Sequence, residues 1–419
     1  MPSPGRNPVW SVNQDVTATG YPGSHRLAVF LLLATLIGFL VLGTLSIYSA
    51  TIADFGNHFF YMQVFWIILG IIICAIIYFI PLKFFYKYSI WGVVFISIPL
   101  FYLALAATAS RFDTSYLRFF PFTREIKGAV RWLSFGSGTM SISFQPSEFA
   151  KFFLLIYLAS YYGSLDREKI KDFVPGILIP SLASFCVLGL IFFGKDLSTT
   201  VVTAALTMSL MWFAGIRFRY IFIIIVVGAL LGVAAIVQNP NRMDRIKAIM
   251  DPELYRFGES YQLYRSQLCL GVGGVTGVGY SQGYMKTYLP EPHTDFIVSV
   301  IGEELGLVGI LLVIGCYLLI FICLYLIARQ CRQRKNLLLC LGCGILVITQ
   351  AIINIGVVSG CCPPTGVTAP FLSYGGSSIL SMMMCMGLIF NIAHDNSTQI
   401  WQEIQKLRYS PAHTRQNAS

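Results

Sequence analysis

Long apolar segments separated by short polar stretches recur along most of this chain of 419 residues. A helix needs about 20 mostly apolar residues to cross the hydrocarbon core of a bilayer, and about ten segments meet that criterion. The pattern therefore predicts an all-α integral membrane protein with about ten transmembrane helices. The predicted spans are residues 27–48, 59–80, 88–107, 149–162, 174–193, 197–214, 221–237, 305–328, 336–358 and 378–392.

The composition agrees with lipid as the solvent of this chain. Hydrophobic residues make up 56% and charged residues 11% of the sequence, whereas a soluble domain carries about 25% charged residues. The net charge of +10 is explained by basic residues that flank membrane spans and pair with the head groups of membrane lipids. No zinc-finger spacing or basic aromatic sheet signature is present, so the sequence predicts no nucleic-acid partner.

Lys and Arg gather in alternate loops, at 83–87, 167–171, 217–219 and 329–335. Basic residues in short loops favour the cytoplasmic side, which predicts that the N- and C-termini are both cytoplasmic. The segment 238–304, which lies outside on this topology, is also basic. An anionic ligand would require such a surplus, and translocation of long loops regardless of charge explains it equally well.

The predicted organisation is a single membrane domain with polar ends. Residues 1–25 lack periodicity and are predicted to be a disordered cytoplasmic arm. Residues 26–394 form the polytopic membrane domain, in which 238–304 is a large extracytoplasmic loop between the seventh and eighth spans. Residues 395–419 are predicted to be a cytoplasmic tail.

The large loop is too long for a passive connector. Apolar spacing predicts amphipathic helices at 242–250 and 259–271. The glycine-rich stretch 271–279 allows the backbone to approach a partner or ligand closely, and a flexible turn is the alternative.

Three polar sites fall on the predicted outer side. The first is the stretch 289–306, which places Glu291, Asp295, Glu303 and Glu304 at the mouth of an apolar segment. Ionisable groups at membrane depth are rare and usually face a cavity, a partner or a substrate. We therefore expect the chemistry of the protein in this stretch.

The second polar site lies around the start of the fourth span. Glu148 and Lys151 share one face of a helix there, with Arg131 shortly before them in the sequence. A helix cap explains Glu148, and an ion pair or an anion site explains Lys151. Asp196 marks the start of the sixth span, where a cap and a functional role are equally compatible with the sequence.

The third polar site is the Pro-, Gly- and hydroxyl-rich stretch 354–378. Irregular backbone at membrane depth persists only where it is buried in protein or lines a wet cavity, and an ordinary connector is the alternative. Together the three sites suggest a cavity for a negatively charged amphiphile or solute. The residues alone leave open a transporter and an enzyme that acts on a membrane-embedded substrate.

Five motifs, in order, distinguish these classes: KGAxRWL…FQPSEFAK, KDLSTTVV, YQLxxSQ…GVGGxxGVG, LPEPHTDFIVSVIGEELGLVG and PxTGVTxPFLSYGGSS. Together they resemble the SEDS family, that is FtsW, RodA and SpoVE, from Ile47 to about Ile392. The resemblance implies a peptidoglycan glycosyltransferase of the bacterial inner membrane with ten spans. It would polymerise lipid II outside the cytoplasm beside a class B penicillin-binding protein that cross-links the product.

The resemblance also implies roles for individual residues. The acid of the TDF motif is Asp295, the expected catalytic residue of an inverting transfer. A divalent cation such as Mg²⁺ is a candidate helper, with no metal ligands assigned. The expected substrate-binding residues are Arg131, Glu148, Lys151, Asp196, Arg242, Arg245, Gln262, Ser266, His293, Thr294, Glu303, Ser373, Tyr374, Gly375 and Gly376.

The subfamily is read from finer features. LPEPHTDF, TGVTxPFLSYGGSS and the long N-terminal arm favour the division type, FtsW. SGCCP and MDRIKAIMDPE fit the elongation type, RodA, nearly as well. A lipid II flippase without bond chemistry and a scaffold that recruits the transpeptidase remain alternatives from other classes.

Overall fold

The computed structural model describes residues 22–126, 129–136, 142–237, 243, 257–258 and 260–408. Each of the ten predicted spans falls on one helix, and the all-α membrane fold is confirmed. The longer helices are α1 (Pro22–Phe55), α2 (His58–Phe79), α4 (Ser89–Phe112), α5 (Pro146–Ser164), α6 (Ile179–Phe193), α7 (Leu197–Ala214), α8 (Phe218–Val237), α10 (Tyr261–Gly273), α11 (Ile297–Arg329), α12 (Arg334–Val358) and α13 (Gly376–Arg408). Shorter elements are α3 (Leu82–Lys87), η2 (Thr114–Phe119), η4 (Lys169–Lys171), the π-helical turn η5 (Val174–Leu178) and η6 (Met285–Tyr288).

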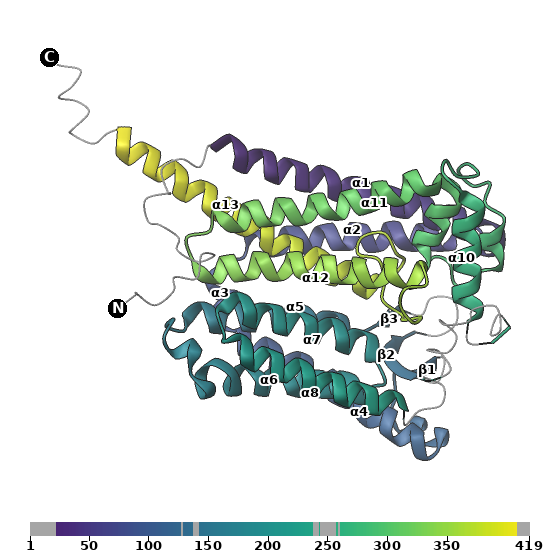
Figure 1. Cartoon of the computed structure of the whole chain (residues 1–419), viewed down its shortest axis with the longest axis horizontal. Helices are drawn as coiled ribbons and strands as arrows, with labels where there is room; N and C mark the ends of the chain where they lie inside the picture. Colours follow the sequence, from purple (N-terminus) through teal and green to yellow (C-terminus); the bar gives the residue numbers. More distant parts are fainter. Residues whose placement is uncertain are drawn as a thin grey trace.

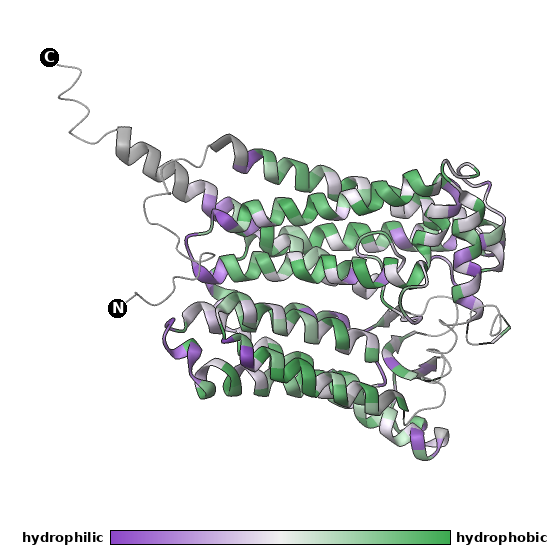
Figure 2. Cartoon of the chain, viewed as in Figure 1, coloured by the Kyte–Doolittle hydropathy of each residue, from purple (hydrophilic) through white to green (hydrophobic). Residues whose placement is uncertain are grey.

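The membrane character of the bundle shows in its surface. Among the described residues, eight helices are long and apolar enough to cross a membrane. Large apolar side chains such as Ile98, Leu182 and Leu230 are exposed on it, which is stable only against lipid. Figure 2 shows hydrophobic colour along the helices and hydrophilic colour gathered toward their ends. The other two predicted spans are α5 and α8, which lie in the same bundle (Figure 1).

Two groups of helices run side by side (Figure 1). Helices α1, α2, α11, α12 and α13 pack on one another, and α4 to α7 form the second group, which α12 and α13 join through α5 and α7. The start of α1 lies beside α13, where His25 Nε2 is 2.8 Å from the carbonyl oxygen of Ala393. We call this end of the bundle the terminal end and the opposite end, with α10, the sheet end.

A three-stranded antiparallel sheet is an addition that hydrophobic periodicity did not predict. It contains β1 (Thr123–Ile126), β2 (Ala129–Phe135) and β3 (Ile142–Phe144), with β2 in the centre. The strands are too short for a clear alternating pattern. Val130 of β2 is buried against Leu103 and Ala107 of α4, so this packing seats the sheet on the end of α4.

Helix α11 is broken near its start. Gly306 has φ 66° and ψ −159°, which divides the helix into a short first piece and a long second piece. The glycine-rich stretch after α10 fills the break. Val278 and Gly279 donate their N–H groups to the carbonyls of Glu303 and Glu304 (both 3.0 Å), and Leu307 donates to the carbonyl of Gly274 (2.9 Å). The amphipathic helix predicted at 259–271 is confirmed as α10, whereas the one predicted at 242–250 lies outside the described residues apart from Met243.

We expect Gly306→Ala to destabilise the protein. The residue lies in a region of φ and ψ that is almost restricted to glycine, and a Cβ would lie 2.4 Å from the nitrogen of Gly277. The expected loss is about 1–3 kcal/mol of folding free energy. It is measured as a lower thermal unfolding midpoint in detergent, with Gly315→Ala of the same helix as control, because no atom lies within 4 Å of that Cβ position. Equal midpoints for the two variants would contradict this account.

Candidate functional site

Asp295 lies at the sheet end, in the turn that leads into α11. The side chain is partly exposed. The hydroxyl of Thr294 lies 2.5 Å from Asp295 Oδ1 and 2.9 Å from the carbonyl oxygen of Glu291. The carbonyl of Asp295 accepts a hydrogen bond of 2.8 Å from the side-chain amide of Asn354 in α12. The turn is therefore held from two sides while the carboxylate stays accessible.

His293 anchors the same turn to its neighbours. Its ring is 6% exposed and lies 4.2 Å from the ring of Phe59, between centroids. The backbone N–H of Tyr374 donates to the carbonyl of His293 (2.8 Å), and the two rings are 5.5 Å apart. Burial raises the pKa of the Tyr374 phenol, partly offset by a hydrogen bond with Trp66. His293 and Tyr374, which are both in the expected substrate-binding set, are therefore in contact.

Glu303 is buried among structural hydrogen bonds, and its substrate-binding role stays a prediction. Its carboxylate is fully buried and accepts the backbone N–H groups of Met285 (2.6 Å) and Lys286 (2.9 Å). The next residue, Glu304, is also buried, pairs with Lys286 Nζ at 2.5 Å and accepts a hydrogen bond from Ser49. Both acids therefore hold the segment before Asp295 against α11 and α1, because a buried carboxylate needs such partners.

The cation Arg131 meets Asp196 at the sheet end. Arg131 Nη1 lies 3.9 Å from Asp196 Oδ1, and Nη2 donates to the carbonyl of Lys195. Asp196 also caps α7 through the N–H of Thr199 (3.2 Å) and accepts hydrogen bonds from Gln145 (3.0 Å) and Ser147 (2.9 Å). Asp196 is therefore a helix cap that also connects β2, α5 and α7, and its functional role stays a prediction.

Glu148 and Lys151 form a buried ion pair in the first turns of α5. Lys151 Nζ lies 2.8 Å from Glu148 Oε1, and the side chain of Lys151 is 2% exposed. Glu148 Oε2 is buried and has no hydrogen-bond partner among the described residues. The pair therefore carries one unused carboxylate oxygen in a region that excludes bulk water.

The third polar stretch folds into the sheet end between α12 and α13. Ser373 is buried and its hydroxyl accepts the N–H of Ala369 (2.8 Å), and Thr368 bonds Ser378 (2.8 Å). A Cβ at Gly376 would lie 2.4 Å from the ring of Trp66, so the close approach of α13 to α2 requires glycine there. Gly375 is partly exposed beside it. The hydroxyl of Ser373 thus stabilises the loop itself, and its contact with a substrate head group stays a prediction.

Two sets of hydrogen bonds connect residues of these clusters. Gln145 bonds Asp196 through its side chain and donates its backbone N–H to Ser377 Oγ (2.9 Å) at the start of α13. The side-chain amide of Asn354 joins the carbonyls of Val367 (2.7 Å) and Asp295. Residues of the three predicted polar stretches therefore lie at the sheet end, and we call them the polar layer.

The remaining predicted residues lie in α10 or outside the described residues. Ser266 of α10 is fully buried and hydrogen-bonds Ser299 (2.7 Å) and the carbonyl of Val358 (2.8 Å), and its substrate-binding role stays a prediction. Gln262 is partly exposed on the same helix. Arg242 and Arg245 lie outside the described residues, and their binding role stays a prediction.

Asn354, Lys286 and Gln145 were missed by the sequence reasoning. Asn354 is a polar residue in an apolar span, and that contrast is a recognisable signal of function or pairing. Lys286 precedes the acid-rich stretch, but nothing local shows which acid it meets.

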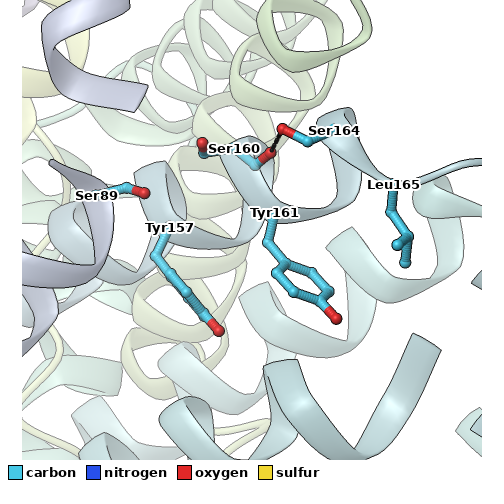
Figure 3. Close-up of a pocket in the computed structure, with 6 residues that line it drawn as sticks. All are labelled: Ser89, Tyr157, Ser160, Tyr161, Ser164 and Leu165. Atoms are coloured by element: carbon cyan, nitrogen blue, oxygen red, sulfur yellow. Dashed lines mark hydrogen bonds between the residues drawn. The ribbon is translucent and has the colours of Figure 1, made fainter. Parts of the chain in front are cut away.

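A cavity of about 260 Å³ lies far from this layer. Ser89 begins α4 and Ser164 ends α5, so the cavity is at the terminal end. Figure 3 shows the side chains that line it, and Ser164 donates to the carbonyl of Ser160 (2.8 Å). The lining residues are Ser89, Tyr157, Ser160, Tyr161, Ser164 and Leu165.

The expected role of a divalent cation stays a prediction. Within the part of the chain that the structure describes, no group of three or more His, Cys, Asp or Glu side chains could hold a metal ion.

The fold and the polar layer define a multi-pass membrane protein with an accessible carboxylate at one end of the bundle. A family model described as Cell cycle protein, FTSW_RODA_SPOVE, matches residues 24–398. The chain belongs to this FtsW, RodA and SpoVE family, and the resemblance read from the motifs is confirmed.

Two relatives show how far the similarity extends. The chain is 32% identical over 372 residues to the "Probable peptidoglycan glycosyltransferase FtsW" of Coxiella burnetii, covering 86% of this chain and 94% of the relative. It is 34% identical over 380 residues to the protein of the same name from Nitrosomonas europaea, covering 87% and 92%.

Solved structures share the fold. A chain from a peptidoglycan synthase complex, described for its structural coordination of polymerization and crosslinking, has a TM-score of 0.70 at 25% identity. The match covers 87% of this chain and 97% of that one. The rod shape determining protein RodA of Thermus thermophilus has a TM-score of 0.59 at 24% identity, with 87% and 96% covered, which supports the fold alone.

We expect Lys151→Met to destabilise the protein and Glu148→Gln to reverse part of the loss in the double variant. Removal of one partner of a buried pair leaves an uncompensated charge, which costs about 3–5 kcal/mol. The double variant removes both charges and avoids that cost. Thermal unfolding of the three variants in detergent measures the effect. A double variant less stable than Lys151→Met would contradict the pairing as the source of stability.

Proposed function

We propose that this chain is a peptidoglycan glycosyltransferase that polymerises lipid II at the sheet end, with Asp295 as the general base. The observation that carries the proposal is the difference in burial between Asp295 and three other acids of the polar layer. Glu303, Glu304 and Asp196 are buried, whereas Asp295 is partly exposed. The names of the relatives support the same reaction class.

The reaction joins the 4-hydroxyl of GlcNAc on one lipid II to the anomeric carbon of MurNAc on another. The hydroxyl oxygen forms the new bond as the bond from the anomeric carbon to phosphate breaks. Undecaprenyl pyrophosphate leaves with the electron pair, and Asp295 accepts the hydroxyl proton. Attack opposite the leaving group inverts the centre, which converts an α-linked donor into a β-linked product.

The leaving pyrophosphate develops charge that cations can stabilise. Lys151 and Arg131 are the candidates among the described residues, and Arg242 and Arg245 are candidates in the large loop. Gln145 and Ser147 tie the Arg131–Asp196 cluster to the same helix that carries Lys151. Lys151 of α5 and Arg131 of β2 would then bind one anionic group together.

The placement in the membrane follows from the charges of the loops. Lys83 and Lys87 lie in the short helix α3, and Arg329 and Lys335 lie at the ends of α11 and α12 that flank their connecting loop. Basic residues in such connections favour the cytoplasm. The sheet end would therefore face outward, with both ends of the chain inside. The relatives reported above carry the name FtsW, which favours the division type over the elongation type, RodA. The similar synthase complex supports a class B penicillin-binding protein as partner.

We expect Asp295→Asn to lower the rate of lipid II polymerisation by about 10²–10⁴-fold, the usual contribution of a general base. The assay uses the purified full chain and lipid II with no other polymerase. Glu291→Gln, an exposed acid of the same turn, is the matched control and should polymerise at the wild-type rate. Polymer formed by Asp295→Asn at the wild-type rate would refute the assignment, and an inactive wild-type protein would favour the flippase or scaffold.

The same assay separates a clamp from a structural pair at Lys151. If Lys151 holds the pyrophosphate, both Lys151→Met and the double variant with Glu148→Gln should lose polymerisation even where the double variant regains thermal stability. Glu148→Gln alone, which keeps the cation, is the control and should retain more activity than either. Recovery of activity in the double variant would show that Lys151 only neutralises Glu148.

A further inference from the structure

Asn354 is one of three buried amides of helix α12, with Asn336 and Gln350, and it is 1% exposed. Its side-chain nitrogen donates to the carbonyl oxygens of Asp295 (2.8 Å) and Val367 (2.7 Å). Both neighbours are acceptors only, so the NH₂ group must face them and the orientation of the amide follows from chemistry. One side chain thus joins the turn before α11 to the loop before α13.

The carbonyl of Asp295 lies just before the hydrogen bonds that begin α11. Those bonds run from the N–H groups of Ser299 and Val300 to the carbonyl of Phe296, one residue later. The bond from Asn354 therefore holds the peptide that follows Asp295 at the point where the helix starts. Because the carbonyl and the carboxylate share one Cα, fixing the peptide limits where the carboxylate can lie.

A second bond acts on the residue two positions earlier. The N–H of Tyr374 donates to the carbonyl of His293 (2.8 Å). The loop that contains Val367 and Tyr374 is therefore bonded to the turn at two carbonyls. Tyr374 bonds the carbonyl of His293 directly, and Val367 is connected to the carbonyl of Asp295 through Asn354. Displacement of a reacting group by about 1 Å can lower a rate about 100-fold.

We propose that Asn354 is a positioning residue that fixes the location of the Asp295 carboxylate relative to the loop 359–375. The inference rests on the proposed function of Asp295. Asn354 does not touch the substrate in this account and acts only through the backbone of the turn.

The test compares Asn354→Leu with Gln350→Met in the purified full chain, with lipid II as substrate. Gln350 lies one turn earlier on α12, is equally buried, and its amide has no hydrogen-bond partner among the described residues. Asn354→Leu should lower kcat about 100-fold with little change in KM for lipid II. The acid limb of its pH–rate profile should match wild type because Asp295 remains the base. Gln350→Met should keep the wild-type kcat.

Asn354→Ser serves if the leucine variant does not fold. It keeps one hydrogen-bond donor on a shorter side chain. Its kcat should lie between those of the wild type and Asn354→Leu. If Asn354→Leu does not fold, the kcat of Asn354→Ser should lie well below that of Gln350→Met. A wild-type kcat in either Asn354 variant, or a raised KM with kcat unchanged, would overturn the positioning role. Failure of the proposed function has a different signature, since Asp295→Asn would then polymerise like wild type and the positioning role would fall with it.

Discussion

The need to satisfy backbone hydrogen bonds at a break in a membrane helix governs the sheet end of this protein. Where α11 is interrupted at Gly306, carbonyls and N–H groups lose their partners within the helix. Without water nearby, such groups must be bonded by protein. The glycine-rich stretch after α10 supplies those bonds because glycine lets two backbones approach closely. The break therefore ties the large loop to the bundle.

This tie has a consequence for the charges. The first piece of α11 begins two residues after Asp295 and contains Glu303 and Glu304. Lys286 of η6, later in the same large loop, bonds both acids. Glu303 and Glu304 therefore bind the loop, while Asp295 lies just before the first piece of α11. One stretch of sequence with four acids is thus divided by geometry into structural and accessible carboxylates.

The other polar elements extend the same layer. Asp196, just before α7, accepts a hydrogen bond from the start of α5 and pairs with Arg131 of the sheet. Ser377 connects that cluster to α13, and Asn354 connects the following loop to Asp295. A substrate bound anywhere on this layer would contact elements that are coupled by direct hydrogen bonds. Such coupling suits a reaction in which a base and a leaving-group site must keep a fixed separation.

The sequence by itself determined the membrane class, the helices on which the predicted spans fall, the helix α10 and the family, because apolar length and ordered motifs are local properties. The TDF motif also led to Asp295 as the expected catalytic residue, and that role stays a proposal. Only the tertiary structure decided that Glu303 and Ser266 are buried in structural bonds, that Lys286 pairs with Glu304, and that Asn354 reaches Asp295. These outcomes depend on contacts between residues far apart in the chain, which neither periodicity nor spacing encodes. The short strands β1–β3 likewise formed on the packing surface of α4, a partner that their own residues do not reveal.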